Sequence, residues 1–260
     1  MNDPLPVPPR PDALAVEPTT TSVTWAWWEV VIAVLIAWVV GGLVSLPLVL
    51  LLEPDASGPI GAETLTIGIV SNAVMLGVLV LWLRSMHPAW VAAIGWPARR
   101  HALREIAVGA GLGILVRIAS AIVAALVVAA LSGASDESVA LPEQVSSDLT
   151  GWGLVSFALF AVIAAPVLEE FVFRGLLFRS IADRHGFWLG AIVSGLAFGA
   201  FHLLTPGPRL DVLALGITLT GTGIGLAWIY RRRGNLLAPI AGHAVFNLIA
   251  VVAIIAGVEV

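Results

Sequence analysis

The sequence predicts an all-α membrane protein: a polytopic bundle of about seven transmembrane helices, with eight as the alternative. Of its 260 residues, 59% are hydrophobic and only 12% are charged, and the mean hydropathy is +0.99. A soluble domain is about 25% charged. Apolar runs of about 20 residues, the length that crosses a bilayer as a helix, recur along the chain. The chain has no cysteine, which excludes disulfides, thiolate metal ligands and a cysteine nucleophile.

The first 24 residues predict a disordered, proline-rich cytoplasmic tail. They hold six of the 16 prolines and no long apolar run. They also lack the basic start and apolar centre of a cleaved signal peptide, so we expect the first span to stay in the mature protein. Residues 25–260 are then expected to form a single integral membrane domain.

Seven apolar runs predict the spans in order. The first follows Trp25, Trp27 and Trp28, a cluster expected at the membrane interface. The segment 87–100 is expected to lie on the cytoplasmic interface, and it is where an eighth span would have to be. Glycine pairs four residues apart, such as those at 109 and 113, predict close helix packing. The predicted spans are 27–52, 65–83, 106–131, 151 to about 184, 187–204, 212–230 and 236–258.

The arginines predict the orientation of these spans. Connections with at least three arginines alternate with connections that have one or none. By the positive-inside rule, the arginine-rich connections are cytoplasmic. We therefore expect a multi-pass protein of the cell membrane, with its N-terminus inside and its C-terminus outside. The arginine-rich connections are 84–104, 174–184 and 231–233.

Three charged residues interrupt an apolar run, "APVLEEFVFRG" at 165–175. On a helix, Glu170 and Arg174 are i, i+4 neighbours in the favourable order and should form an ion pair. Glu169 is rotated by about 100° from Glu170, so it is the carboxylate left for chemistry. Pro166 should loosen the helix just before it. The alternative is that all three are interfacial charges at the end of the fourth span.

Polar groups on two later spans favour the buried interpretation. At 1.5 Å per residue from the cytoplasmic ends, His202 lies about 22 Å deep, Asn247 about 17 Å and His243 about 11 Å. If the fourth helix continues to about residue 184, Glu169 also lies about 22 Å deep. These levels lie within a turn or two of one another, so we expect a long fourth helix and a buried polar cavity.

These residue types suit hydrolysis by an activated water. A carboxylate and a neutral imidazole can act on one water as base and orienting partner. A second histidine and an amide can stabilise the oxyanion of an attacked carbonyl. The alternative is a zinc site formed by Glu169, His202 and His243, because two histidines and one glutamate are a known catalytic ligand set. Residue type alone leaves both open.

Three motifs carry a resemblance to a known family. In order along the chain they are "EEFVFR" (169–174), "FGAFH" (198–202) and "HAVFN" (243–247). Together they resemble the motifs of the CAAX prenyl protease and bacteriocin-processing family, also called Abi, which are intramembrane endopeptidases. The resemblance covers a catalytic core at about 150–255, whereas the earlier spans match only in being membrane helices.

The resemblance implies a role for each motif residue. Glu169 would be the water-activating base and His202 its assistant, while His243 and Asn247 would stabilise the oxyanion or the substrate carbonyl. It also implies Glu170 with Arg174 as a supporting pair and Phe198 as a packing residue. The implied substrate is a peptide or protein, membrane-anchored or prenylated, and nucleic acid is not expected as a partner. No cofactor is implied firmly, and zinc remains the alternative.

Arg117, in the middle of the third span, is outside these motifs. No acid lies one turn away, so we expect it to contact Glu169 or Glu170, or to bind a substrate carboxylate.

Two other functions of the protein stay open from the sequence. One is an ion- or proton-coupled transporter using the buried polar groups, and the other is a non-catalytic membrane scaffold or immunity protein.

Overall fold

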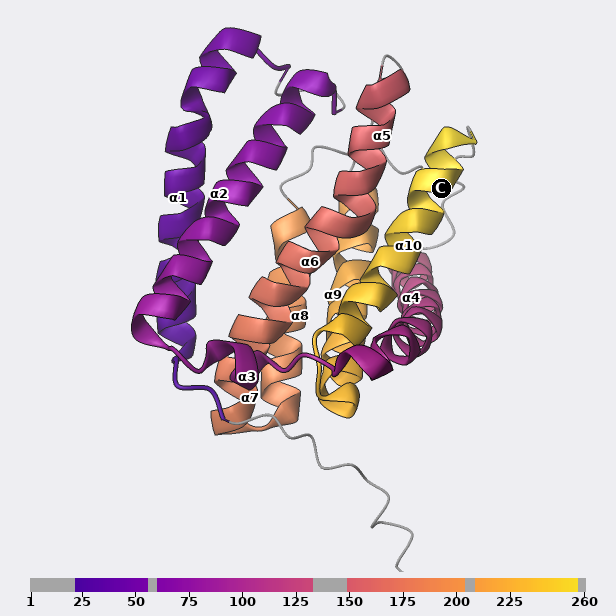
Figure 1. Ribbon diagram of the computed structural model, residues 1–260. Helices are drawn as coiled ribbons and strands as arrows, with labels where there is room; N and C mark the ends of the chain where they lie inside the picture. Colours follow the sequence, from indigo (N-terminus) through magenta and orange to yellow (C-terminus); the bar gives the residue numbers. More distant parts are fainter. Residues whose placement is uncertain (1–21, 56–59, 133–148, 204–208, 257–260) are drawn as a thin grey trace, which may run out of the picture.

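The computed structural model describes residues 22–55, 60–132, 149–203 and 209–256. The helices form an upright bundle (Figure 1). In chain order the elements are α1 (Trp27–Leu52), α2 (Ala62–Met86), α3 (Trp90–Ile94), the 3-10 turn η2 (Arg99–His101), α4 (Ala102–Ser132), α5 (Gly151–Leu159), η3 (Phe160–Ala164), α6 (Ala165–Glu170), η4 (Phe171–Phe178), α7 (Arg179–His185), α8 (Phe187–His202), α9 (Arg209–Arg233) and α10 (Leu237–Ile255).

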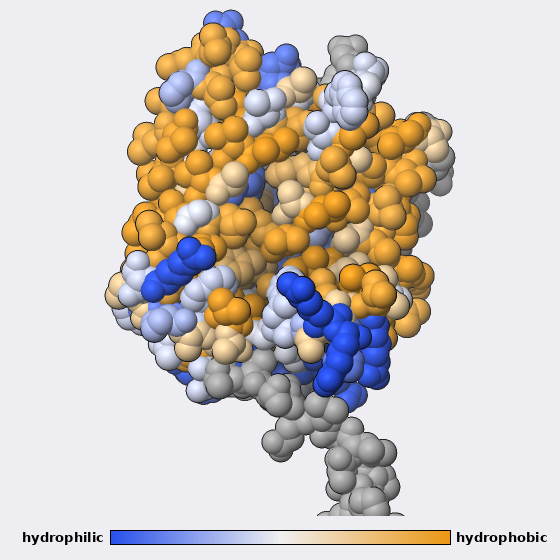
Figure 2. All heavy atoms as spheres, in the orientation of Figure 1, coloured by the Kyte–Doolittle hydropathy of each residue, from blue (hydrophilic) through white to orange (hydrophobic). Residues whose placement is uncertain are grey.

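Among the described residues, five helical segments are long and apolar enough to cross a membrane, which confirms an all-α, multi-pass membrane protein. The predicted first span coincides with α1, and the predicted fifth lies in α8, a shorter apolar helix of 16 residues. The visible sides of α1, α2 and α10 present apolar side chains (Figure 2). The five segments are Trp27–Leu52, Ala62–Met86, Trp90–Val127, Gly151–His185 and Leu237–Ile255.

The segment 87–100 does not contain an eighth span. Its helix α3 has only 5 residues, about 8 Å of helix, far less than the membrane thickness. It is also packed more closely than a segment that merely lies on the interface. Ile94 is buried, its carbonyl accepts a 2.6 Å hydrogen bond from the Tyr230 hydroxyl, and Arg179 donates to the Ala93 carbonyl at 3.0 Å.

The fourth helix is continuous from Gly151 to His185, as predicted. Two stretches of it, η3 and η4, are wound as π-helix, with hydrogen bonds that skip one more residue than in an α-helix. In η3 the N–H of Ala165 accordingly bonds the Phe160 carbonyl. Pro166, which has no N–H, follows directly, so the predicted loosening of this helix is confirmed. The two π-helical stretches enclose α6, the six residues that end in Glu169 and Glu170.

The predicted glycine pair at 109 and 113 marks a close helix contact. A Cβ atom on Gly109 would lie 2.1 Å from the Ala238 carbonyl oxygen, and one on Gly113 would lie 2.3 Å from the Cα of Gly242. Both contacts join α4 to α10. On its other side α4 meets α9, where a Cβ on Gly225 would lie 2.2 Å from Val116. These approaches hold α10 and its motif in a fixed register against α4.

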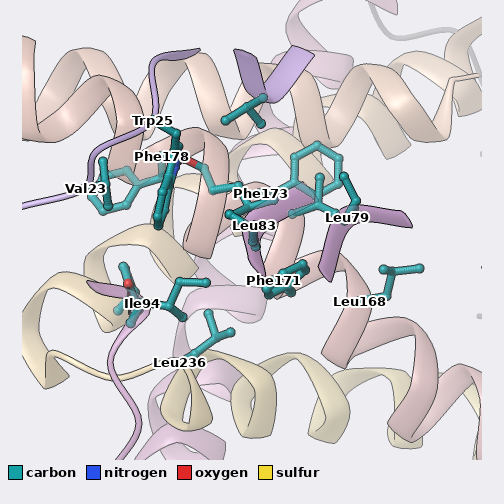
Figure 3. Packing of buried hydrophobic residues seen from close by; sticks show 14 of the residues in the cluster. Val23, Trp25, Leu79, Leu83, Ile94, Leu168, Phe171, Phe173, Phe178 and Leu236 are labelled. Atoms are coloured by element: carbon teal, nitrogen blue, oxygen red, sulfur yellow. Dashed lines mark hydrogen bonds between the residues drawn. The ribbon is translucent and has the colours of Figure 1, made fainter. Parts of the chain in front are cut away.

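The end of the predicted tail is packed against the bundle. Residues 1–21 lie outside the described residues, but Val23 is buried and its N–H donates to Asp183 at 3.0 Å. Trp25 was expected at the interface, and this is wrong: it is fully buried and its indole donates to the Leu176 carbonyl at 3.2 Å. Figure 3 shows Trp25 beside Phe178 in the hydrophobic core. A tryptophan that finds a buried acceptor gains more from burial than from the interface.

Candidate active site

Glu170 and Arg174 form the predicted ion pair. Arg174 Nη1 lies 2.7 Å from Glu170 Oε1, and both side chains are 0% exposed. Arg174 Nη2 also donates to the Gly223 carbonyl of α9 at 3.2 Å. A buried charge is tolerated only when it is paired and hydrogen-bonded. The pair therefore ties the fourth helix to α9 at the level of Glu169.

Phe198 packs at the centre of the site, as the second motif predicted. It is fully buried on α8, and the Arg174 guanidinium lies 4.5 Å from the centre of its ring. The same ring contacts Phe173 at 5.2 Å, His202 at 4.8 Å and His243 at 5.5 Å between centroids. Its aromatic face supplies further stabilisation of the buried guanidinium. Substitution of Phe198 would thus disturb both histidines and the ion pair together.

His202 presents its Nε2 atom to Glu169. Its Nδ1 lies 2.8 Å from the Phe198 carbonyl of its own helix. A carbonyl only accepts, so Nδ1 carries the hydrogen and the neutral ring has its lone pair on Nε2. This Nε2 faces Glu169 Oε2 at 3.9 Å. The last turn of α8 therefore sets the tautomer that a water-orienting histidine needs.

His243 approaches the same oxygen of Glu169 from α10. Its Nδ1 lies 2.9 Å from Glu170 Oε1, the same oxygen that pairs with Arg174, and its Nε2 lies 3.7 Å from Glu169 Oε2. The ring stacks on Phe246 with centroids 4.9 Å apart and an interplanar angle of 21°. The predicted meeting of Glu169, His202 and His243 at one level is thus confirmed. Phe246 lies between His243 and Asn247 in the third motif and drew no separate prediction.

Asn247 makes a contact that the sequence did not predict. Its Nδ2 donates to the Ala161 carbonyl in η3 at 2.8 Å. In π-helical winding the partner of this carbonyl would be the nitrogen of Pro166, which has no hydrogen. Asn247 supplies the missing donor. One of its two amide hydrogens is thereby used, and its role toward a substrate carbonyl stays a prediction.

The side chains of the site differ in their exposure to solvent. The side chains of Glu169 and His202 are 19% and 29% exposed, whereas that of His243 is 4% exposed. Behind these, Glu170 and Arg174 are closed off completely. Figure 2 shows hydrophilic atoms set back in the apolar surface between α2 and α6. Glu169 and His202 are therefore the partly exposed members of the set, although the Oε2 atom of Glu169 is itself shielded from solvent.

The ligand atoms of the three zinc-ligand candidates are farther apart than those of a tetrahedral zinc site. Ligands about 2.1 Å from one tetrahedral metal lie roughly 3.4 Å apart, and the Glu169 oxygen is 3.9 and 3.7 Å from the two imidazole nitrogens. Across the described stretches of the chain, no group of three or more histidine, aspartate or glutamate side chains could hold a metal ion. The residues as placed do not fit zinc, and we derive no step through a metal.

Arg117 does not reach the carboxylates. The expectation that it contacts Glu169 or Glu170 is wrong, because Glu170 is occupied by Arg174 and His243 and neither carboxylate forms an ion pair with Arg117. Among the described residues, the buried Nη1 atom of Arg117 has no hydrogen-bond partner.

Comparison with known proteins identifies the motif-bearing part of the chain. Residues 151–249 match the sequence profile of a family described as Rce1-like, type II CAAX prenyl endopeptidase. Over that segment, which is less than half of the chain, the protein is similar to the Rce1-like family. The segment contains all three motifs, and α1 to α4 lie outside it. The Rce1-like residues are those that the structure brings together around Glu169.

Two relatives support this identification over part of their length. A Bacillus subtilis protein named as a candidate membrane peptidase, YdiL, is 28% identical over 90 residues, which is 35% of this chain and 34% of the relative. An uncharacterized protein of Mycoplasma capricolum is 33% identical over 107 residues, 41% of this chain and 30% of the relative. The matches thus span about a third of each relative. No solved structure matches the chain.

Proposed function

We propose that this protein is an intramembrane endopeptidase that hydrolyses a peptide bond with water activated by Glu169 and His202. One observation carries the proposal: two imidazole Nε2 atoms converge on Glu169 Oε2, at 3.9 and 3.7 Å, from two different helices. In each ring the Nδ1 atom is committed elsewhere, so both reactive nitrogens are directed at the carboxylate. A carboxylate and two imidazoles in this arrangement can exchange protons with a molecule bound between them, as general acid–base catalysis requires.

The first step is attack by water. A separation of 3.9 Å between Glu169 and His202 is too long for a direct hydrogen bond and is one that a water can bridge. That water donates one hydrogen to the carboxylate and the other to Nε2 of the neutral His202. Its oxygen forms a bond to the peptide carbonyl carbon as Glu169 takes the first proton.

The second step is collapse of the tetrahedral intermediate. With the first proton on Glu169, the Glu170–Arg174 pair is neutral and the oxyanion carries the uncompensated negative charge, which we assign to a doubly protonated His243 to offset. The Nε2–H of that imidazolium then donates to the oxyanion, and we assign the second amide hydrogen of Asn247 the same role. Glu169 returns its proton to the amine nitrogen as the C–N bond breaks. The products are a carboxylic acid and an amine.

The substrate class follows from the site's position in the membrane. We propose a peptide or protein that is membrane-anchored, prenylated in the CAAX-type case. We further propose seven spans, with the N-terminus in the cytoplasm and the C-terminus outside. The support is the alternation of arginine-rich connections and the depth of Glu169, about 24 Å from the end of its helix at His185.

The test compares wild type with Glu169→Gln at equal expression in the native host. New protein N- and C-termini are catalogued by mass spectrometry, so the substrate need not be identified beforehand. We expect termini that appear only with wild type and with a control variant, Glu63→Gln, an exposed carboxylate at the start of α2. Identical profiles for all three proteins, with each folded and inserted, would overturn the proposal. Proton- or ion-coupled flux in liposomes would then identify a transporter, and its absence a scaffold.

A further inference from the structure

A cavity without charged residues in its lining lies between α2, α3, the fourth helix and the start of α10. Its volume is about 230 Å³. On α2 it reaches from Val80 to Leu76, which are about 9 and 15 Å from the end of the helix at Met86. One leaflet of the hydrocarbon layer is about 15 Å deep. The cavity therefore has the position and the lining that suit one acyl chain.

The wall that α3 contributes to this cavity is held in place by its backbone. The Gly95 carbonyl accepts a hydrogen bond from the N–H of Leu236 at 3.2 Å. The carbonyls of Ile94 and Ala93 are bonded to side chains of α9 and α7, as described above. Figure 3 shows Ile94 beside Leu236, and both line the cavity. The cavity is thus already formed without an occupant, as most ligand sites are.

Positive charge follows directly after this wall. Trp96 lines the cavity, and Arg99 is three residues further on, at most about 11 Å along the chain. Arg99 and Arg100 are exposed, and among the described residues neither forms an ion pair. The stretch 84–104 holds four arginines and no acidic residue. Figure 2 shows strongly hydrophilic side chains below the apolar surface, near the start of α4. Basic pockets between spanning helices bind anionic lipid head groups.

The second basic stretch, at the end of α9, has no comparable cavity. Arg233 is paired with Glu105, to which its Nε donates at 2.8 Å, and the Arg232 guanidinium lies 5.5 Å from the centre of the Trp228 ring. The cavity that Arg231 lines has a volume of only about 10 Å³. Among the described residues, Arg99 and Arg100 are therefore the exposed pair of arginines that adjoins a space large enough for a chain.

We propose that the protein binds one anionic phospholipid, with its phosphate on Arg99 and Arg100 and one acyl chain in the cavity. A guanidinium binds phosphate oxygens through paired, charge-assisted hydrogen bonds. The chain supplies the packing contacts that the lining residues lack while the cavity is empty. Because Ile240 of the lining is one turn before His243, the bound lipid supports α2, α3 and α10 beside the site. This inference does not depend on the proposed endopeptidase function.

The test counts the lipids that stay bound to the purified protein. Wild type is placed in vesicles of equal parts phosphatidylcholine and phosphatidylglycerol with a small fraction of geranylgeraniol. It is then extracted in mild detergent and measured by native mass spectrometry. We expect retained phosphatidylglycerol, favoured over phosphatidylcholine by about ten-fold or more. Adding phosphatidylglycerol to the delipidated protein should raise its melting temperature, because the lipid binds the folded state.

Three variants separate the two parts of the lipid site. Arg99→Gln/Arg100→Gln should remove most of the preference for phosphatidylglycerol. Arg231→Gln/Arg232→Gln removes the same charge from the other basic stretch and is the matched control, which should keep the preference. Val80→Phe places a larger side chain in the cavity and should lower the retention of both phospholipids.

Several results would overturn the inference. Equal retention of the two phospholipids by wild type, or an equal loss in the two double arginine variants, would show only attraction to surface charge. Unchanged retention in Val80→Phe and in Val91→Phe, a second lining position at a more exposed site, would show that no chain enters the cavity. Retained geranylgeraniol in place of phosphatidylglycerol would identify an isoprenoid chain as the occupant. A lipid-free dimer would show that a second copy of the protein covers the cavity.

Discussion

The two adjacent glutamates of the first motif have different environments. Glu170 is sealed in by Arg174 and His243, whereas Glu169 remains partly accessible beside His202. Their separation follows from helix geometry, since neighbouring residues point about 100° apart. One carboxylate thus holds the supporting residues in place, and the other can meet a substrate.

His202 should be needed for rate and little needed for folding. We expect His202→Ala to lower kcat by about 100-fold or more, the usual contribution of a positioned acid–base group. Because its side chain is 29% exposed, the melting temperature in detergent should change little. Steady-state kinetics and thermal melts on the same preparations check both halves. Loss of folding together with loss of activity would contradict a purely catalytic role for His202.

The Glu170–Arg174 pair should show strong coupling. Arg174→Leu leaves a buried carboxylate without its counter-charge, and we expect a loss of about 3–5 kcal/mol in the free energy of unfolding. The double variant Glu170→Leu/Arg174→Leu removes both charges and should be more stable than Arg174→Leu alone. Both variants should be inactive, because His243 is disturbed. Unfolding measured by reversible denaturation in mixed micelles tests this order, and a double variant less stable than the single one would contradict it.

At the scale of the elements, the sequence predicted the helices better than their winding. The spans at 27–52 and 151–184 were predicted because long apolar runs specify membrane helices, and the shared depth of Glu169 and His202 required the fourth helix to continue. The π-helical stretches were not predicted. A π-helix differs from an α-helix only in which carbonyl each backbone N–H bonds. Apart from Pro166, no residue in or beside η3 has a side chain that predicts this hydrogen-bond pattern. The fully buried Trp25 was missed because its acceptor, the Leu176 carbonyl, lies 151 residues away.

The contact between Asn247 and Ala161 allows its structural and chemical roles to be separated. Asn247→Ala leaves the Ala161 carbonyl without a donor, and we expect a loss of about 1–3 kcal/mol in stability. Pro166→Ala supplies a backbone N–H in the same place, so the double variant Pro166→Ala/Asn247→Ala should recover most of that stability. Activity should stay low in the double variant if the amide also contacts substrate. Thermal melts and peptide cleavage are measured together, and recovery of both would assign Asn247 a purely structural role.

At the scale of the whole molecule, two glycines of α4 fix how α10 is placed against it. Gly109→Ala would put a Cβ atom 2.1 Å from the Ala238 carbonyl, which forces the backbones apart. We expect a loss of at least about 2 kcal/mol in stability and a large loss of activity, because α10 carries His243. Gly111→Ala, on the same helix with nothing within 4 Å, should be neutral or slightly stabilising. Equal stability of the two variants would contradict the packing described.

The bond between His202 Nδ1 and the Phe198 carbonyl also limits what genetics can detect. The acceptor that sets the proton of this imidazole is main chain, and every amino acid at position 198 would provide it. Substituting all amino acids at position 198 would therefore measure the effect of losing the Phe198 ring, but it would not test the hydrogen bond that the Phe198 carbonyl accepts. Only replacement of the amide between residues 198 and 199 by an ester, whose carbonyl accepts more weakly, or a change that frays the last turn of α8, could bring that interaction into view.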